Sequence, residues 1–138
     1  MKRKLALLLV VTMLLCLVGC EQKKNYNPNL PESIVNGLLA MDKALDDYLN
    51  YDINATELAE KMNDLTERIK GNRWMDDDTI SIEAKVDRSA VNLICMKFKS
   101  FFVGFDSPYL YTDSEKNKKI MDKIDEWKQD IADVLYEE

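Results

Sequence analysis

The three cysteines of this 138-residue chain, at positions 16, 20 and 95, offer its most distinctive side-chain chemistry. A thiol can carry lipid, pair in a disulfide, or attack a substrate as a thiolate. The last role normally needs a neighbouring base, and the sequence contains no histidine. A zinc site or a nucleophile–base pair would have to be built from carboxylates and thiols alone. This inventory predicts a protein that is not an enzyme and that uses no metal and no cofactor.

Cys20 stands at the junction between an apolar run and a polar segment that contains lysines. Three basic residues at positions 2–4 precede the apolar run over residues 5–18, which is interrupted only by Thr12. A helix of this length is about 21 Å long, whereas a membrane span needs about 20 residues. The pattern predicts a cleaved export signal, residues 1–19, rather than a retained transmembrane anchor.

The four residues before and at the junction, Leu17-Val18-Gly19-Cys20, resemble the lipobox of bacterial lipoproteins. The resemblance covers only the first 20 residues. It implies cleavage between Gly19 and Cys20 and a diacylglycerol on the Cys20 thiol. The protein would then be a lipid-anchored protein of the bacterial cell membrane, facing the extracytoplasmic side. An ordinary export signal with an incidental cysteine is the alternative.

Cys95 is then the one cysteine left to the folded domain, since Cys16 leaves with the signal and Cys20 carries lipid. No intrachain disulfide can form from a single remaining thiol. Ile94 and Met96 flank Cys95, which predicts a buried and inert thiol.

The acidic run Met75-Asp76-Asp77-Asp78-Thr79 is the most suggestive candidate for a cation site. A calcium loop needs oxygen ligands at alternate positions around a turn that contains glycine. Three consecutive acids do not supply that pattern, and acids favour the positive N-terminal end of a helix. We therefore expect this run to open a helix.

Residues 97–111, KFKSFFVGFDSPYLY, form an aromatic-rich segment. Phe102, Tyr109 and Tyr111 have no obvious place on a helical stripe, which makes them candidate contacts for a protein partner. The alternative is that these aromatics close the open end of the core. A second set, Met41, Met62, Met96 and Met121, could line a cavity for an apolar ligand, although methionine more often fills gaps in a core.

The charge of the chain bears on its partners. Cleavage after residue 19 removes three positive charges and no negative ones, so the formal net charge falls from −6 to −9. Such a domain repels nucleic acid. The charge predicts no nucleic-acid binding and a basic surface on any electrostatically steered partner.

The elements that must position these residues are read from apolar spacing. Residues 20–30 are polar and lack periodicity, which predicts a tether. Steps of three and four between apolar residues then predict helices over residues 31–50, 55–70, 76–103 and 113–136. Gly37 is expected to mark a close approach by a neighbouring helix, and Gly71 a left-handed helix end.

Two local features refine these boundaries. Capping boxes are expected at Asn54 with Glu57 and at Thr112 with Glu115. Alternation of apolar residues over 79–87 also resembles a strand, but no partner strand is evident, so a helix is preferred there.

The sequence thus predicts an all-α protein. An antiparallel four-helix bundle, residues 31–138, follows a cleaved signal and a short lipid-anchored tether. We expect a non-catalytic protein-interaction module at the cell envelope, held to the membrane by lipid on Cys20. A carrier or sensor of a small apolar ligand is the alternative.

Overall fold

The computed structural model describes residues 25–136, and over this range the protein is all-helical, as predicted. The whole of the expected signal, Gly19 included, and the first residues of the expected tether, Cys20 included, lie outside the described residues. The described part contains no β-strand, only an isolated bridge between Tyr26 and Tyr136. The helices are α2 (Glu32–Leu49), α3 (Ala55–Lys70), the 3-10 helix η1 (Arg73–Asp76), α4 (Ile82–Phe101), α5 (Asp113–Met121) and α6 (Ile124–Leu135).

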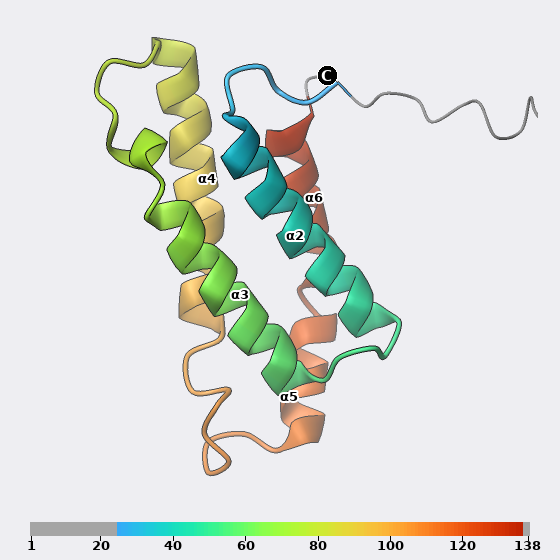
Figure 1. The fold of residues 1–138 in the computed structure, drawn as a ribbon. Helices are drawn as coiled ribbons and strands as arrows, with labels where there is room; N and C mark the ends of the chain where they lie inside the picture. Colours follow the sequence, from blue (N-terminus) through green and yellow to red (C-terminus); the bar gives the residue numbers. More distant parts are fainter. Residues whose placement is uncertain (1–24, 137–138) are drawn as a thin grey trace, which may run out of the picture.

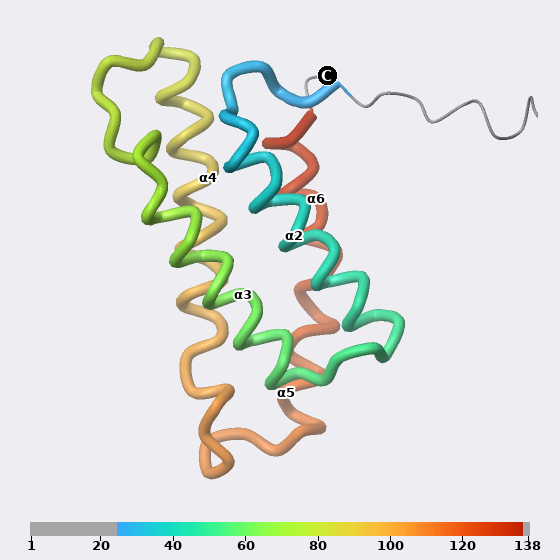
Figure 2. The backbone as a smooth tube through the Cα atoms, in the orientation of Figure 1, coloured from blue at the N-terminus to red at the C-terminus, as the bar shows by residue number. Residues whose placement is uncertain are grey.

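The α-helices pack around a shared apolar core, and their directions alternate. α2 and α4 each contact both α3 and α6, while α5 contacts α3 and α6. α2 and α4 run away from the chain ends, whereas α3, α5 and α6 run back towards them (Figure 1). The two ends of the described chain therefore lie at one end of the molecule, which we call the termini end. Residues 50–54 and 102–112 form the opposite, loop end (Figure 2).

The first two helices follow the predicted spacing. The apolar residues of α2 that follow steps of three and four are all buried. α3 opens with the expected capping box between Asn54 and Glu57. The close approach at Gly37 is confirmed, because a Cβ there would lie 2.8 Å from Ile69 Cγ1. The left-handed end at Gly71 is wrong, since its φ is −77°. The chain turns directly into η1, whose first turn is capped by the Asn72 side chain.

The third helix begins later than predicted, and the acidic run does not cap it. α4 starts at Ile82, and the Ser81 hydroxyl accepts from the Ala84 N–H. Asp77 instead accepts hydrogen bonds from the N–H and hydroxyl of Thr79, at 2.8 and 2.6 Å. This local turn competes with the helix. Residues 82–87 are helical, so the strand alternative is wrong.

The fourth predicted helix is broken into α5 and α6 at residues 122–123. The Lys123 N–H bonds to the Ile120 carbonyl three residues back, which tightens the turn. The capping box of Thr112 and Glu115 is confirmed at the start of α5. The stripe stays buried across the break, at Ile120, Ile124, Trp127, Ile131 and Val134.

Residues 26–30, expected to belong to a free tether, pack against α6. The Asn27 N–H donates to the Leu135 carbonyl at 2.8 Å, and both Asn27 and Leu30 are buried. The Tyr26 ring stacks on Tyr136 with a centroid distance of 5.7 Å. A polar asparagine in an aperiodic stretch gave no sign of this docking, because its partners lie more than a hundred residues away.

No helix among residues 25–136 has the length and apolar character needed to cross a membrane.

Candidate functional site

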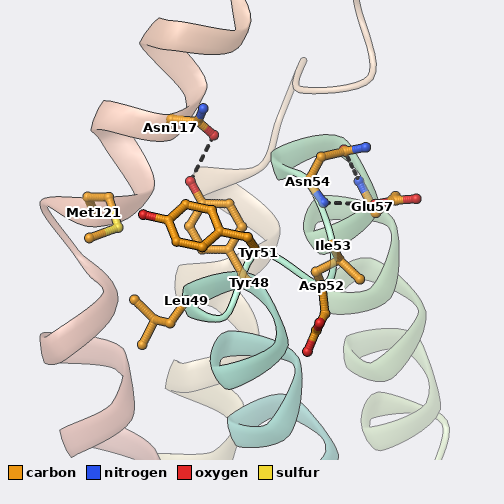
Figure 3. Close-up of a pocket in the computed structure, with 9 residues that line it drawn as sticks. All are labelled: Tyr48, Leu49, Tyr51, Asp52, Ile53, Asn54, Glu57, Asn117 and Met121. Carbon is orange, nitrogen blue, oxygen red and sulfur yellow. Dashed lines mark hydrogen bonds between the residues drawn. The ribbon is translucent and has the colours of Figure 1, made fainter.

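The loop end contains a pocket of about 640 Å³ between the α2–α3 connection and α5 (Figure 3). Its apolar lining comes from Leu49, Ile53 and Met121, and two tyrosines, Tyr48 and Tyr51, add aromatic rings. Its volume falls within the range of small-molecule sites, which are commonly 300–1,000 Å³. The pocket is open to solvent along one side.

Tyr48 links the helices on the two sides of this pocket. It is the last buried residue of the α2 stripe, and its hydroxyl donates to Asn117 Oδ1 on α5 at 2.8 Å. Burial raises the pKa of the Tyr48 hydroxyl. A tyrosine hydroxyl is already neutral at pH 7, and burial acts in the same direction, so the proton is available for this hydrogen bond.

Tyr51 stands at the rim with its side chain 94% exposed. Its φ is +63°, and it is the only non-glycine residue among residues 25–136 with a positive φ. A left-handed backbone costs a bulky L-residue about 1–3 kcal/mol. A strained backbone thus holds a large aromatic ring in water beside an apolar pocket.

The charged side chains that line the pocket are all acidic. Asp52 and Glu57 both face it, and no lysine or arginine lines it. The Glu57 carboxylate accepts from the Asn54 N–H at 2.8 Å as part of the helix cap. Aromatic rings beside carboxylates can receive an apolar group or a cationic side chain.

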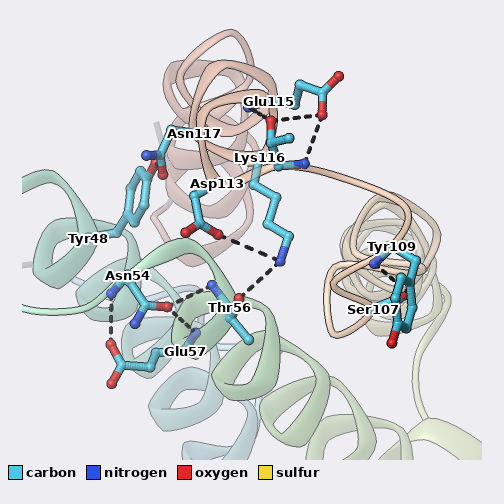
Figure 4. A network of polar contacts seen from close by, with 11 residues as sticks. Tyr48, Asn54, Thr56, Glu57, Ser107, Tyr109, Asp113, Glu115, Lys116 and Asn117 are labelled. Atoms are coloured by element: carbon cyan, nitrogen blue, oxygen red, sulfur yellow. Dashed lines mark hydrogen bonds and ion pairs between the residues drawn. The ribbon is translucent and has the colours of Figure 1, made fainter.

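A buried lysine holds α5 against the start of α3 (Figure 4). Lys116 is 4% exposed, and its Nζ lies 3.3 Å from the Thr56 hydroxyl and 4.0 Å from Asp113 Oδ1. A lysine in an amphipathic helix is ordinarily expected on the solvent-exposed face, so residue type alone does not predict this burial. The apolar stripe that continues through Ile120 reaches position 116 when it is extended back by one helical turn. The spacing therefore indicated a buried position, but a charged side chain there argued against burial.

We expect Lys116→Met to raise the free energy of unfolding by about 1 kcal/mol, because the buried ammonium has only a hydroxyl and one distant, exposed carboxylate as partners. Urea denaturation at pH 7, followed by circular dichroism, measures the change. Lys118→Met, on the exposed face of the same helix, is the matched control and should change stability by less than about 0.5 kcal/mol. A loss of stability in Lys116→Met would mean that these contacts outweigh the desolvation cost.

The three predicted contact residues occupy different environments. Phe102 is 2% exposed and belongs to an aromatic cluster in the core, so it presents almost no surface to a partner. Tyr111 is partly buried, with its ring 5.5 Å from that of Phe105 and Lys119 Nζ 4.4 Å above it. Only Tyr109, at 95% exposure, projects freely from the loop end. The alternative that these aromatics close the core therefore holds for Phe102 and largely for Tyr111.

Gly104 makes this division of the aromatic segment possible. Its φ is +82°, and a Cβ at this position would lie 2.6 Å from Leu110 Cδ1. The turn directs Phe105 into the core while residues 109–110 remain outside.

The four methionines do not line a common cavity. Met41 and Met62 are fully buried core residues, whereas Met96 lies on the outer face of α4 and Met121 at the pocket rim. The sequence did not predict the pocket itself or Tyr51, because the pocket joins residues from α2, the following loop and α5.

Cys95 is buried and unpaired, as predicted. Burial raises the pKa of its thiol to about 11, which makes it a poor nucleophile at neutral pH. Among residues 25–136, no group of three or more histidine, cysteine, aspartate or glutamate side chains is arranged to hold a metal ion.

Compared with known proteins, the chain matches no family model, no curated protein and no solved structure. The function proposed below therefore draws on the sequence pattern at the N-terminus, the fold and the loop-end site.

Proposed function

We propose that this protein is a bacterial lipoprotein, anchored by acyl chains on Cys20, whose helical domain acts as a non-catalytic protein-interaction module at the extracytoplasmic face of the cell membrane. The basic start, the short apolar run and the Leu17–Cys20 lipobox support the anchor. We also infer that α5 and α6 act as one broken helix, so that the domain is an antiparallel four-helix bundle. The alternating helix directions and the pairwise contacts support this inference.

The packed position of residues 26–30 constrains how an anchored domain would sit. Only residues 20–25 would separate the lipid from the domain, and a chain of that length reaches about 20 Å at most. Tyr26 lies at the termini end. This end would therefore be held near the bilayer, and the loop end would be the part most available to a partner.

The exposure of Tyr51 and Tyr109 at the loop end is the observation that carries this proposal. Both residues are more than nine-tenths exposed, and Leu110 beside Tyr109 is 63% exposed. Tyrosine is enriched in the energetically dominant part of protein interfaces. The acidic charge of the domain and the carboxylates of the pocket favour a partner with a basic surface.

The proposal is tested by affinity capture of the tagged, full-length protein from envelopes of its native host. In the test variant, Tyr51→Asn is combined with Tyr109→Ser; asparagine tolerates the left-handed backbone at position 51. We expect the variant to recover at least about tenfold less partner than the wild type. Tyr26→Ser, which removes a half-exposed ring at the termini end, should recover the wild-type amount. Equal recovery by the loop-end variant would exclude this surface as the contact.

The alternative function, binding of a small apolar ligand, is favoured by the pocket lined by Leu49, Ile53 and Met121. Native mass spectrometry of the purified full-length protein distinguishes the two. A bound small molecule that is lost in Met121→Arg would support the alternative. Partner capture that survives Met121→Arg but fails in the tyrosine variant would support the interaction module.

A further inference from the structure

The outward face of α4 carries an uncharged seam that no part of residues 25–136 covers. Its members are all exposed and follow steps of four and three: Ile82, Val86, Ser89, Leu93, Met96 and Ser100. The four apolar members are 77%, 65%, 55% and 52% exposed in chain order. Charged residues make up 32% of the chain, yet none stands on this line, although Glu83 and Lys99 beside it are also exposed.

The width and spacing of this α4 seam suit a single helix as the covering element. Ile82, Ser89 and Met96 are seven residues apart, and so are Val86, Leu93 and Ser100. A seam with two contact positions in every seven residues is typical of two helices that pack side by side. A helix that packs on a broad surface has a wider apolar face. The two serines permit close approach of a second backbone, and the Ser89 hydroxyl already donates to the Lys85 carbonyl at 2.9 Å. Burying Ser89 would therefore leave its proton satisfied.

The two flanks of the seam carry opposite charge. On the side of α6, Glu83, Asp87 and Asp133 line a groove next to Val86. Further along this flank, Lys97 pairs with Glu126 and Asp130, and Lys123 also pairs with Glu126. The α6 flank therefore holds five carboxylates against two lysines.

The flank on the side of α3 is basic on balance. Lys70 and Arg88 line a groove next to Ser89 together with Asp76. Lys99 pairs with Glu67 of α3, and Lys85 lies on the same side of the helix at 100° per residue. Asp77 also lies near Arg88 and Arg73, so this flank holds five cations against three carboxylates.

From these observations we propose that a second copy of this chain covers the α4 seam, with the two α4 helices parallel and in register around a two-fold axis. In a parallel pair, the acidic α6 flank of each copy faces the basic α3 flank of the other. In an antiparallel two-fold pair, each flank would face its own equivalent and the acidic flanks would repel. Charge complementarity thus selects the parallel arrangement.

The parallel arrangement also places like residues opposite each other along the seam. Ile82, Val86, Leu93 and Met96 each meet their equivalents, and the serines form the close contacts between them. Both termini ends lie on the same side of such a dimer. Two copies could then be anchored in one membrane, although the pairing itself does not depend on lipid.

Cysteine cross-linking of the full-length protein in membranes tests the pairing and its direction. Ser89→Cys and Ser100→Cys, made separately, should each form a disulfide-linked dimer under mild oxidation. Ser114→Cys, exposed on α5 away from the seam, is the control for random collision, and the wild type reports any reaction of Cys20 or Cys95. Cross-linking at position 89 but not at position 100 would indicate an antiparallel pair and overturn the proposed arrangement. Cross-linking at neither position above the Ser114→Cys level would exclude the pairing.

Leu93→Glu provides the second measurement, on the full-length protein purified in detergent. We expect it to weaken dimerisation at least about tenfold in sedimentation equilibrium. Leu110→Glu, an equally exposed leucine at the loop end, should leave the dimer intact. A wild-type protein that is monomeric at all accessible concentrations would overturn the proposal, whatever the outcome for the anchor or for the loop-end partner.

Discussion

Replacing Trp127 with alanine is expected to lower the free energy of unfolding by about 3–5 kcal/mol, a large share of the 5–15 kcal/mol typical of a domain. Trp127 is 3% exposed and stands on α6 against the aromatic cluster of α4. Its ring centroid lies 4.6 Å from that of Phe101 and 5.2 Å from that of Phe98, both in edge-on arrangements. The variant therefore loses burial, aromatic pairing and the contact that joins α4 to α6.

Urea denaturation monitored by circular dichroism measures this loss. The chain has a second tryptophan, Trp74 in η1, which is also buried but packs at the termini end. We expect Trp74→Ala to cost clearly less, because η1 is a short connecting element. Equal losses of unfolding free energy in the two variants would show that the aromatic cluster around Trp127 contributes no more to stability than the contacts of Trp74.

Replacing Cys20 with serine is expected to abolish membrane anchoring completely. The proposed anchor requires a thioether to diacylglycerol, which a hydroxyl does not form in the same reaction. Each buried acyl CH₂ contributes about 0.8 kcal/mol, so loss of two or more chains removes essentially all bilayer affinity. Labelling with radioactive palmitate and membrane fractionation measure the effect.

Cys16→Ser is the matched control for this change. It alters a cysteine within the expected signal and should leave palmitate labelling and fractionation unchanged. A Cys20→Ser protein that is processed and fractionates like the wild type would contradict the lipoprotein assignment. The proposed α4 pairing would survive that result, because the seam lies wholly within the described domain.

Two surfaces with different tasks follow from the proposals. The loop end, with Tyr51 and Tyr109, would contact a partner, while the α4 seam would bring two copies together. These surfaces do not overlap, since the seam ends at Ser100 before the aromatic turn begins. A parallel dimer would therefore present two loop ends in the same direction and increase avidity for a partner with repeated sites.

The site was only partly predictable from the sequence. Tyr109 was identified as a candidate contact and is fully exposed, but Phe102 is a core residue and Tyr111 is half-buried. An aromatic-rich segment has the same composition whether its rings point inward or outward. Packing against other elements decides which rings are buried, as the contact of Phe102 with Trp127 of α6 shows. Tyr51 was missed because its exposure depends on the left-handed turn after α2.

The sequence by itself determined the helical class, the ranges of α2 and α3, and the capping boxes at Asn54 and Thr112. Each of these depends on interactions between residues three or four apart, which a local pattern contains.

Only the tertiary structure decided the burial of Lys116, the docking of Asn27 and the loop-end pocket. The late start of α4 combines a local cause, the Asp77–Thr79 turn, with a contact from the following helix, in which the Arg88 guanidinium donates to the Asp77 carbonyl at 2.8 Å. Lys116 contacts Thr56, which lies 60 residues earlier in the chain. Asn27 bonds to Leu135, which lies 108 residues later (135 − 27). Such contacts form only after the helices have packed, because burial and pairing between distant residues depend on which faces come together.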